Sequence, residues 1–146
     1  MTMDPKDIRQ LLAELRDINK QKRRTAVMKL GMVGGDQALR ALISTVSNEC
    51  EDLIVRGRAA LMLGKLGDPR AVDSLIHALH APGYQTPLQA AQALGLIGDE
   101  RAIEPLLILA ITGHDKTRDA AIEALQRLGY KSEEEIEESE PETENG

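Results

Sequence analysis

Residues 63–75 read Leu-Gly-Lys-Leu-Gly-Asp-Pro-Arg-Ala-Val-Asp-Ser-Leu, and a closely similar pattern returns at residues 30–42 and 94–106. A fourth copy starts at residues 125–129 and stops after its second glycine position. The leading leucines stand at positions 30, 63, 94 and 125, so the period is 33, 31 and 31 residues. A repeat of this length is typical of solenoids, in which each unit buries its apolar face against its neighbours.

Each repeat is predicted to be two helices joined by a tight turn. An alanine stands four residues before each leading leucine, where a small side chain lets a second helix approach closely. A glycine stands four residues after it, where a helix ends in the left-handed conformation. Asp68 and Asp99 follow two of these glycines and are placed to cap the second helix, with Pro69 in its first turn. The two columns are Ala26, Ala59, Ala90 and Ala121, and Gly34, Gly67, Gly98 and Gly129.

This pattern predicts an all-α superhelix with three full helix-pair repeats and capping helices. The expected helices are 5–17, 20–33, 36–47, 52–66, 69–80, 86–97, 100–111 and 115–128. Gly31, Gly64 and Gly95 fall inside first helices, where glycine costs about 1 kcal/mol relative to alanine, so we expect them at close helix–helix contacts.

The two ends of the chain are predicted to behave differently from the repeats. An apolar stripe of Ile8, Leu11, Leu12, Leu15 and Ile18 predicts a first helix that covers the top of the stack. Helix 115–128 is expected to close the other end. We assign residues 1–130 to the repeat domain and 131–146 to an acidic disordered tail, in which Ser132 and Glu135 form a capping box for a brief helix.

Composition narrows the possible functions. The net charge is −6, but residues 131–146 hold eight Glu and one Lys, which leaves the rest of the chain near +1 and gives no general attraction to nucleic acid or anionic membrane. The aromatic residues are two tyrosines, which favours a core of aliphatic residues and alanine. The single cysteine allows no intramolecular disulfide, and no apolar run reaches the ~20 residues of a membrane span, so we expect a cytoplasmic protein.

The columns resemble HEAT repeats, specifically the short form called PBS-lyase HEAT-like repeats. The resemblance covers residues 19–130 and is closest from Val55 to Val72. It implies a right-handed superhelix with first helices outside and second helices on the concave face. Arg23, Arg56 and Arg118 occupy the family's arginine column, whereas the third repeat has Pro87 there.

No local signature of catalysis is present, and we predict that the chain is not an enzyme and needs no cofactor. HEAT-like deoxyhypusine hydroxylases hold iron on His-Glu pairs, and this sequence has no adjacent His-Glu pair. Asp73, His77 and His80 share one helical stripe, but ~10 Å separates the first from the last, too far for all three to hold one metal ion. Either neighbouring pair, assisted by Glu104, remains a possible metal site, and a solvated polar groove is the favoured interpretation.

The favoured function is a protein–protein interaction scaffold that binds its partner with the second helices 36–47, 69–80 and 100–111. Tyr84, in the irregular connection 81–84 before the third repeat, marks a further candidate contact. The first alternative is an accessory or chromophore-lyase-type component, because the family's name-giving members attach bilins to phycobiliproteins. Nucleic-acid binding through the basic residues between Arg16 and Lys29 is a less favoured alternative. The candidate face is Arg40, Ser44, Arg70, Asp73, Ser74, His77, His80, Arg101, Glu104 and Ile108.

Overall fold

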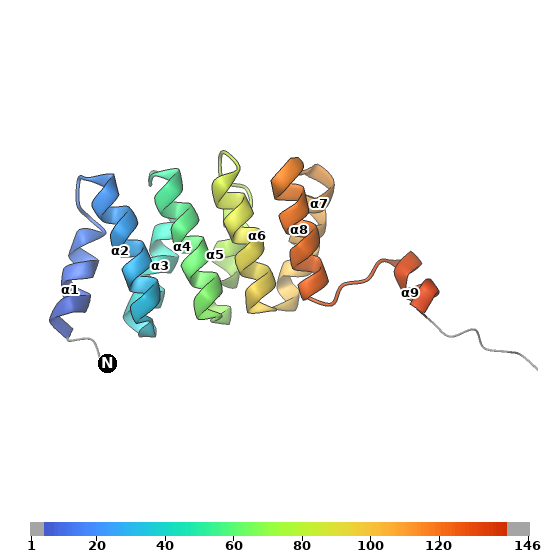
Figure 1. Cartoon of the computed structure of the whole chain (residues 1–146), viewed down its shortest axis with the longest axis horizontal. Coiled ribbons are helices and arrows are strands. Elements are labelled where there is room, and N and C mark those ends of the chain that lie inside the picture. The colour runs from blue at the N-terminus through green and yellow to red at the C-terminus, as the bar shows by residue number, and fades with distance from the viewer. Residues whose placement is uncertain (1–4, 140–146) are drawn as a thin grey trace, which may run out of the picture.

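The computed structural model describes residues 5–139, with side chains from residue 7, and within that range it contains helices and no strand. The chain folds into a single stack of antiparallel helices (Figure 1). The elements are α1 (Pro5–Glu14), α2 (Lys20–Val33), α3 (Gly35–Ser47), α4 (Leu53–Leu66), η1 (Pro69–Ala71), α5 (Val72–Ala78), α6 (Gln85–Ile97), η2 (Glu100–Ala102), α7 (Ile103–Thr112), α8 (Asp115–Arg127) and α9 (Glu133–Ser139). The predicted helical solenoid is confirmed.

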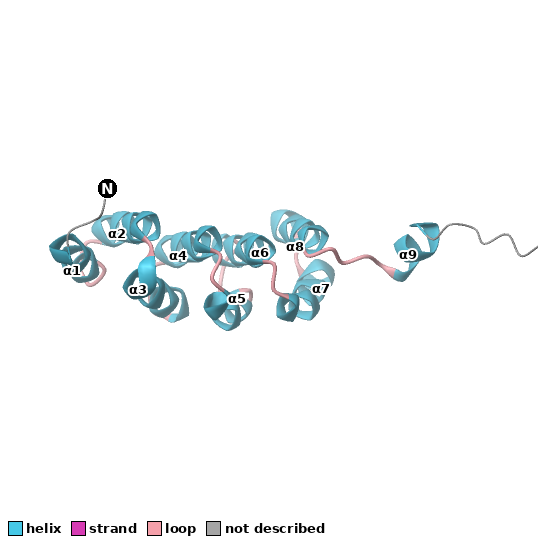
Figure 2. Cartoon of the chain, turned by 90° about the horizontal axis from the view of Figure 1, so that it is seen from below, coloured by secondary structure: helices cyan, strands magenta, loops and turns pink. Residues whose placement is uncertain are grey.

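The stack has two rows of helices (Figure 2). The first-helix row consists of α2, α4, α6 and α8, and each of these helices packs directly on the next. The second-helix row consists of α3, α5 and α7, and each of these helices packs chiefly on the first helix of the following repeat. The stack is nearly straight in both views, so the concave placement of the second-helix row stays a prediction.

The first-helix row is held together by the small residues that the repeat pattern singled out. Ala59 and Ala90 are fully buried. A Cβ atom added to Gly64 would lie 2.7 Å from Cα of Ala93, and a Cβ on Gly95 would lie 2.9 Å from Cα of Ala124. Real Cβ atoms do not approach backbone so closely, so glycine is required there for the helices to pack at this distance. The prediction of close helix–helix contacts at these glycines is confirmed.

The turns within the second and third repeats also follow the sequence. In the first repeat Gly34 has φ of 69° and ψ of −162°, outside the predicted left-handed helical conformation, and α3 begins at the next residue without a side-chain cap. Gly67 and Gly98 end α4 and α6 with φ of 69° and 78°, in the left-handed region. The Oδ1 atom of Asp68 accepts a hydrogen bond from the backbone N–H of Arg70 at 2.9 Å, and Asp99 accepts one from Arg101 at 3.0 Å. The predicted helices 69–80 and 100–111 begin as 3₁₀ turns, in which the backbone N–H of Ala71 donates to the carbonyl of Asp68 and that of Ala102 donates to the carbonyl of Asp99, both at 3.1 Å.

The first helix is shorter than predicted and does not use its whole apolar stripe. It ends at Glu14, and Ile18, expected on the buried stripe, is 99 % exposed. Oδ1 of Asp17 accepts a hydrogen bond from the backbone N–H of Asn19 at 2.8 Å, which turns the chain and directs Ile18 outward. Leu11 is buried as predicted.

The brief acidic helix after the stack forms as the capping box predicts. The backbone N–H of Ser132 donates to Glu135 Oε2 at 3.1 Å, and the backbone N–H of Glu135 donates to Ser132 Oγ at 3.2 Å. The predicted division of the chain at residue 131 stays a prediction, and residues 140–146 of the expected tail lie outside the described residues.

Candidate functional site

The second-helix row presents the predicted binding face to solvent as a set of linked charges. Arg40 pairs with Asp36 at 3.0 Å, and the other carboxylate oxygen of Asp36 accepts a hydrogen bond from Arg70 at 2.7 Å. One repeat further on, Arg101 pairs with Asp73 at 3.3 Å. These pairs join α3 to η1 and α5 to η2, so one ion pair crosses each of the two boundaries between full repeats.

Each of these arginines is also held by the aspartate of its own turn. Arg70 donates to Asp68 at 2.9 Å and Arg101 donates to Asp99 at 2.9 Å. These hydrogen bonds hold the pKa of both aspartates below the usual range and raise the pKa of both arginines. The two guanidinium groups are therefore fixed in direction although their side chains are 57 % and 52 % exposed.

The remaining predicted residues of this face are dispersed along it. Ser44 is exposed beside α1, Ser74 is half-buried, and Glu104 is exposed at the start of α7. Ile108 is 49 % exposed, at the position held by His77 in α5 and Ser44 in α3. This one position therefore changes from polar in the first two repeats to apolar in the third.

The structure does not bring Asp73, His77 and His80 together around a metal ion. Asp73 pairs with Arg101, and Nε2 of His77 lies 3.4 Å from Oε1 of Glu49 in the preceding connection. Within the described part of the chain, no group of three His, Cys, Asp or Glu side chains is placed to hold a metal ion.

His80 instead lines a pocket of about 620 Å³ between the ends of α5 and α7. The floor is apolar and includes the buried Leu79 and Pro87, and Tyr84, 59 % exposed, stands at the rim. The irregular connection thus forms one wall of the pocket, and the turn before α8 forms the other. The pocket is lined by Leu79, His80, Ala81, Gly83, Tyr84, Pro87, Leu109, Thr112, Gly113, His114, Asp115, Lys116 and Thr117.

The break in the arginine column accounts for this pocket. Arg56, one repeat earlier, is 2 % exposed, and its Nε donates to the carbonyl of Val46 at the end of α3 at 3.1 Å. Pro87 holds the same position in α6, and Leu79 holds the position of Val46. Proline is too short to fill the space and has no donor for that carbonyl. The sequence marked the irregular position, but it did not identify the pocket walls on α7 and α8.

A second pocket, of about 730 Å³, lies between α1 and α3. Its polar rim includes Arg9, Arg16 and Asn48, and its floor includes Leu12 and Ala41. Sequence reasoning missed it, because α1 lies outside the repeats and its position relative to α3 is a tertiary property.

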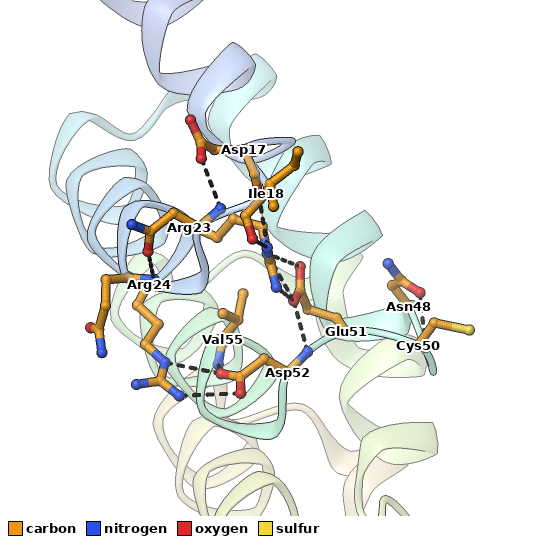
Figure 3. A network of polar contacts seen from close by, with 11 residues as sticks. Asp17, Ile18, Arg23, Arg24, Asn48, Cys50, Glu51, Asp52 and Val55 are labelled. Atoms are coloured by element: carbon orange, nitrogen blue, oxygen red, sulfur yellow. Dashed lines mark hydrogen bonds and ion pairs between the residues drawn. The ribbon is translucent and has the colours of Figure 1, made fainter.

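The loop edge between α1 and α4 carries a compact network of ion pairs (Figure 3). Arg23 pairs with Glu51 at 3.0 Å and donates to the carbonyl of Asp17 at 2.7 Å, and Arg24 pairs with Asp52 at 3.0 Å. The bond from Arg24 holds the pKa of Asp52 below its usual value. Arg23 and Arg24, two of the basic residues between Arg16 and Lys29, are thus paired with carboxylates, which weakens the alternative of nucleic-acid binding.

Comparisons with known proteins agree with this geometry. The family model for HEAT repeats matches residues 8–87, and the model for the PBS lyase HEAT-like repeat matches residues 87–111. No curated protein matches the sequence significantly.

Among solved structures, the complex of CpcE and CpcF of phycocyanin lyase from Nostoc sp. PCC7120 contains a chain that is 29 % identical, with a TM-score of 0.73, over 84 % of this chain and 53 % of that one. Human deoxyhypusine hydroxylase in complex with glycerol is 24 % identical, with a TM-score of 0.74, over 88 % of this chain and 46 % of that one. An engineered protein is 18 % identical, with a TM-score of 0.62, over 92 % of this chain and 66 % of that one. The last two likenesses show the fold alone. The chain spans about half the length of the first two proteins.

These findings correct the prediction that the chain is not an enzyme. The PBS lyase repeat model and the 29 % identity to a chain of the phycocyanin lyase complex point to enzyme-related homologues. The prediction was wrong because it relied on local catalytic motifs, and a repeat protein can contribute to an enzyme with residues spread over several repeats.

No helix within residues 5–139 is long and apolar enough to cross a membrane, and the cytoplasmic location stays a prediction. The matched family model covers more than half of the sequence, and the repeats, caps and two-row packing all agree with it. The chain therefore belongs to the HEAT repeat family.

Proposed function

We propose that the chain is a protein-binding component of a lyase-type enzyme assembly and that it binds its protein partner with the second-helix row. The observation that supports this proposal best is the exposed set of ion pairs on α3, η1, α5 and η2. The apolar pocket between the ends of α5 and α7 lies in the same row of helices. The likeness to a chain of a two-protein lyase complex supports the choice of a protein as partner and of a lyase as enzyme class.

The arrangement suits binding because few of its side chains have to become ordered when a partner binds. Asp68 and Asp99 already hold Arg70 and Arg101, so these side chains lose less rotamer freedom on binding than free arginines lose. The pocket then offers an apolar site in which a partner's side chain is desolvated, as at the hot spots of protein interfaces.

Charge reversal on the second-helix row tests the binding face. The variant combines Arg40→Glu, Asp73→Lys and Glu104→Lys, and its matched control combines Arg58→Glu, Asp119→Lys and Glu123→Lys on α4 and α8. All six residues are exposed, and both variants change the net charge by the same amount. The tagged chain is incubated with native cell lysate, and each captured protein is quantified. We expect the first variant to lose at least about tenfold of the specific partner and the control to keep it.

Equal capture by both variants would contradict the binding face. The lyase class has a separate readout, in which the chain and its captured partner are mixed with a bilin and the absorbance spectrum is followed. A spectral shift that requires the chain is expected, and an unchanged spectrum would contradict the lyase class without affecting the result on the binding face.

A further inference from the structure

The last repeat leaves an apolar surface uncovered. On α6, the residues that face the following repeat are small and buried. Ala91 is fully buried, and Gly95 lies against the backbone of Ala124 in α8. In α8 the same two positions are held by Ile122, which is 39 % exposed, and Gln126, which is exposed. The surface of α8 that corresponds to the α8-binding surface of α6 is therefore not covered by any other described residue.

The second-helix row ends in the same way. His80 faces the following repeat, because it lines the pocket between α5 and α7. Its position in α7 is held by Ile111, which is 82 % exposed. We call Ile111, Ile122 and Gln126 the C-terminal end face. Helix α9 does not cover it, since all seven of its residues are exposed and it lies beyond α8 along the long axis of the stack (Figure 1).

The opposite end of the stack also exposes large apolar side chains. Met32 is 82 % exposed and Ile18 is 99 % exposed. Lys29 is exposed and holds in α2 the position that Ala93 holds in α6 and Ala124 holds in α8. Each of those alanines packs against a glycine of the preceding first helix. Helix α1 packs on α2 at this end but leaves Ile18, Lys29 and Met32 exposed, and we call these three residues the N-terminal end face. The three most exposed large hydrophobic residues of the described chain thus lie at its two ends, where solenoids ordinarily carry polar caps.

The two ends carry opposite charge. Residues 5–33 contain eight Lys and Arg and three Asp and Glu, a net charge of +5, or +3 when Glu51 and Asp52, the partners of Arg23 and Arg24, are included. Residues 131–146 contain eight Glu and one Lys, a net charge of −7. At the N-terminal end, Arg9, Arg16, Lys20 and Lys29 form no ion pair with another described residue. The acidic helix projects away from the C-terminal end, in the direction from which a further repeat would arrive.

We propose that the C-terminal end face binds the N-terminal end face of a second copy of this chain, with the acidic segment 131–139 lying against the basic α1 and α2 of that copy. Apolar contact at Ile111 and Ile122 provides the burial, and the opposite charges select the head-to-tail orientation over two like ends. A two-fold pairing of the C-terminal ends would bring two acidic segments together. Because the interface joins two different surfaces, each bound copy leaves a free end, and association continues beyond two copies.

Sedimentation velocity of the full chain over a wide range of concentration tests the proposal. The average mass is expected to rise past that of two copies and to fall at high salt, because the attraction between the ends is screened. The variant Ile111→Asp, Ile122→Asp is expected to weaken association more than about a hundredfold, since it places charge in a desolvated contact. Ile111→Asp alone, at an 82 % exposed position, serves if the double variant fails to fold, as judged by circular dichroism. The control Leu96→Asp changes a side chain that is 48 % exposed in mid-stack and is expected to associate like the unchanged chain.

Mixing two blocked variants distinguishes the head-to-tail arrangement from every symmetric one. The C-terminal variant above keeps a free N-terminal end face, and the variant Lys29→Glu, Met32→Asp keeps a free C-terminal end face. Each alone is expected to be a single chain, and their mixture is expected to form pairs and nothing larger. A chain that stays single at all concentrations, or a Lys29→Glu, Met32→Asp variant that still dimerises alone, would overturn the proposal. Neither result bears on partner capture by the second-helix row.

Discussion

Arg56 in α4 and Pro87 in α6 hold the same position in successive repeats, but their surroundings differ. The arginine is buried and donates a hydrogen bond to the carbonyl of Val46 at the end of α3. The proline leaves the corresponding space open as a pocket of about 620 Å³. One position in a repeat column therefore distinguishes a junction with a buried arginine from a junction with an open pocket.

The polar contacts at the two junctions differ as well. Asp52, before α4, pairs with Arg24 and accepts a hydrogen bond from the backbone N–H of Val55. Gly83 and Tyr84, before α6, provide no carboxylate, and Thr86 donates instead to the carbonyl of Leu53. The first junction is therefore held by charges and the second by a neutral bond and apolar packing.

Removing the buried arginine is expected to have the largest effect. Arg56→Ala should lower the free energy of unfolding by about 3 kcal/mol, because it leaves a cavity and deprives the carbonyl of Val46 of its donor. Urea unfolding measures the change. The matched control Arg58→Ala, at an exposed position of the same helix, should change it by less than about 0.5 kcal/mol. Equal effects of the two substitutions would refute the role assigned to Arg56.

Neutralising Asp52 is expected to weaken only the charged junction. Asp52→Asn keeps a capping side chain but loses the partly buried pair with Arg24, which should cost about 1.5 kcal/mol at neutral pH. Because the folded state holds the pKa of Asp52 below 3.8, its value without these contacts, the charge stabilises the fold above about pH 4 and this contribution is lost as pH falls through the folded pKa. The difference between the two proteins in urea unfolding should therefore shrink between pH 7 and pH 3. A difference independent of pH would be inconsistent with this account.

Removing the hydroxyl of Thr86 tests the neutral junction. Thr86→Val should cost about 1 kcal/mol, since the fully buried side chain loses its hydrogen bond to the carbonyl of Leu53. Thr117→Val, at the same position in α8, is the control and should change stability less, because no bond from its hydroxyl to residues 5–139 is found. Thermal unfolding at neutral pH compares the two.

Restoring the arginine in the third repeat is expected to change stability least and the pocket most. In Pro87→Arg the new side chain should occupy the pocket and donate to the carbonyl of Leu79, with a change in unfolding free energy below about 1 kcal/mol. A crystal structure of the variant shows whether the pocket is filled. An arginine that points to solvent and leaves the pocket open would contradict the conclusion that Pro87 is the cause of the pocket.

The repeat pattern predicted most of the fold because it depends on contacts that recur. The alanine and glycine columns, the aspartate caps and the capping box at Ser132 are local features, each with a fixed spacing in the chain. The end of α1 was not predicted, because an apolar residue at the correct spacing does not stay buried when a side-chain hydrogen bond, here from Asn19 to Asp17, turns the chain first.

The candidate site was predicted less completely. The sequence indicated the second-helix face and the irregular connection at Tyr84, since both follow from the repeat alignment. It did not show that His77 faces Glu49 while His80 lines a pocket, because both facts depend on which side chains of neighbouring repeats reach them.

The helices, the turns and the order of the repeats can be predicted from the sequence alone, because they depend on backbone conformation and short-range spacing. Which charges pair across the repeats, where the pocket beside Pro87 opens and which apolar residues stay uncovered at the two ends follow from the tertiary structure. These properties depend on side chains about thirty residues apart in the chain, as Arg24 and Asp52 are, and their contacts are set by the way whole helices pack.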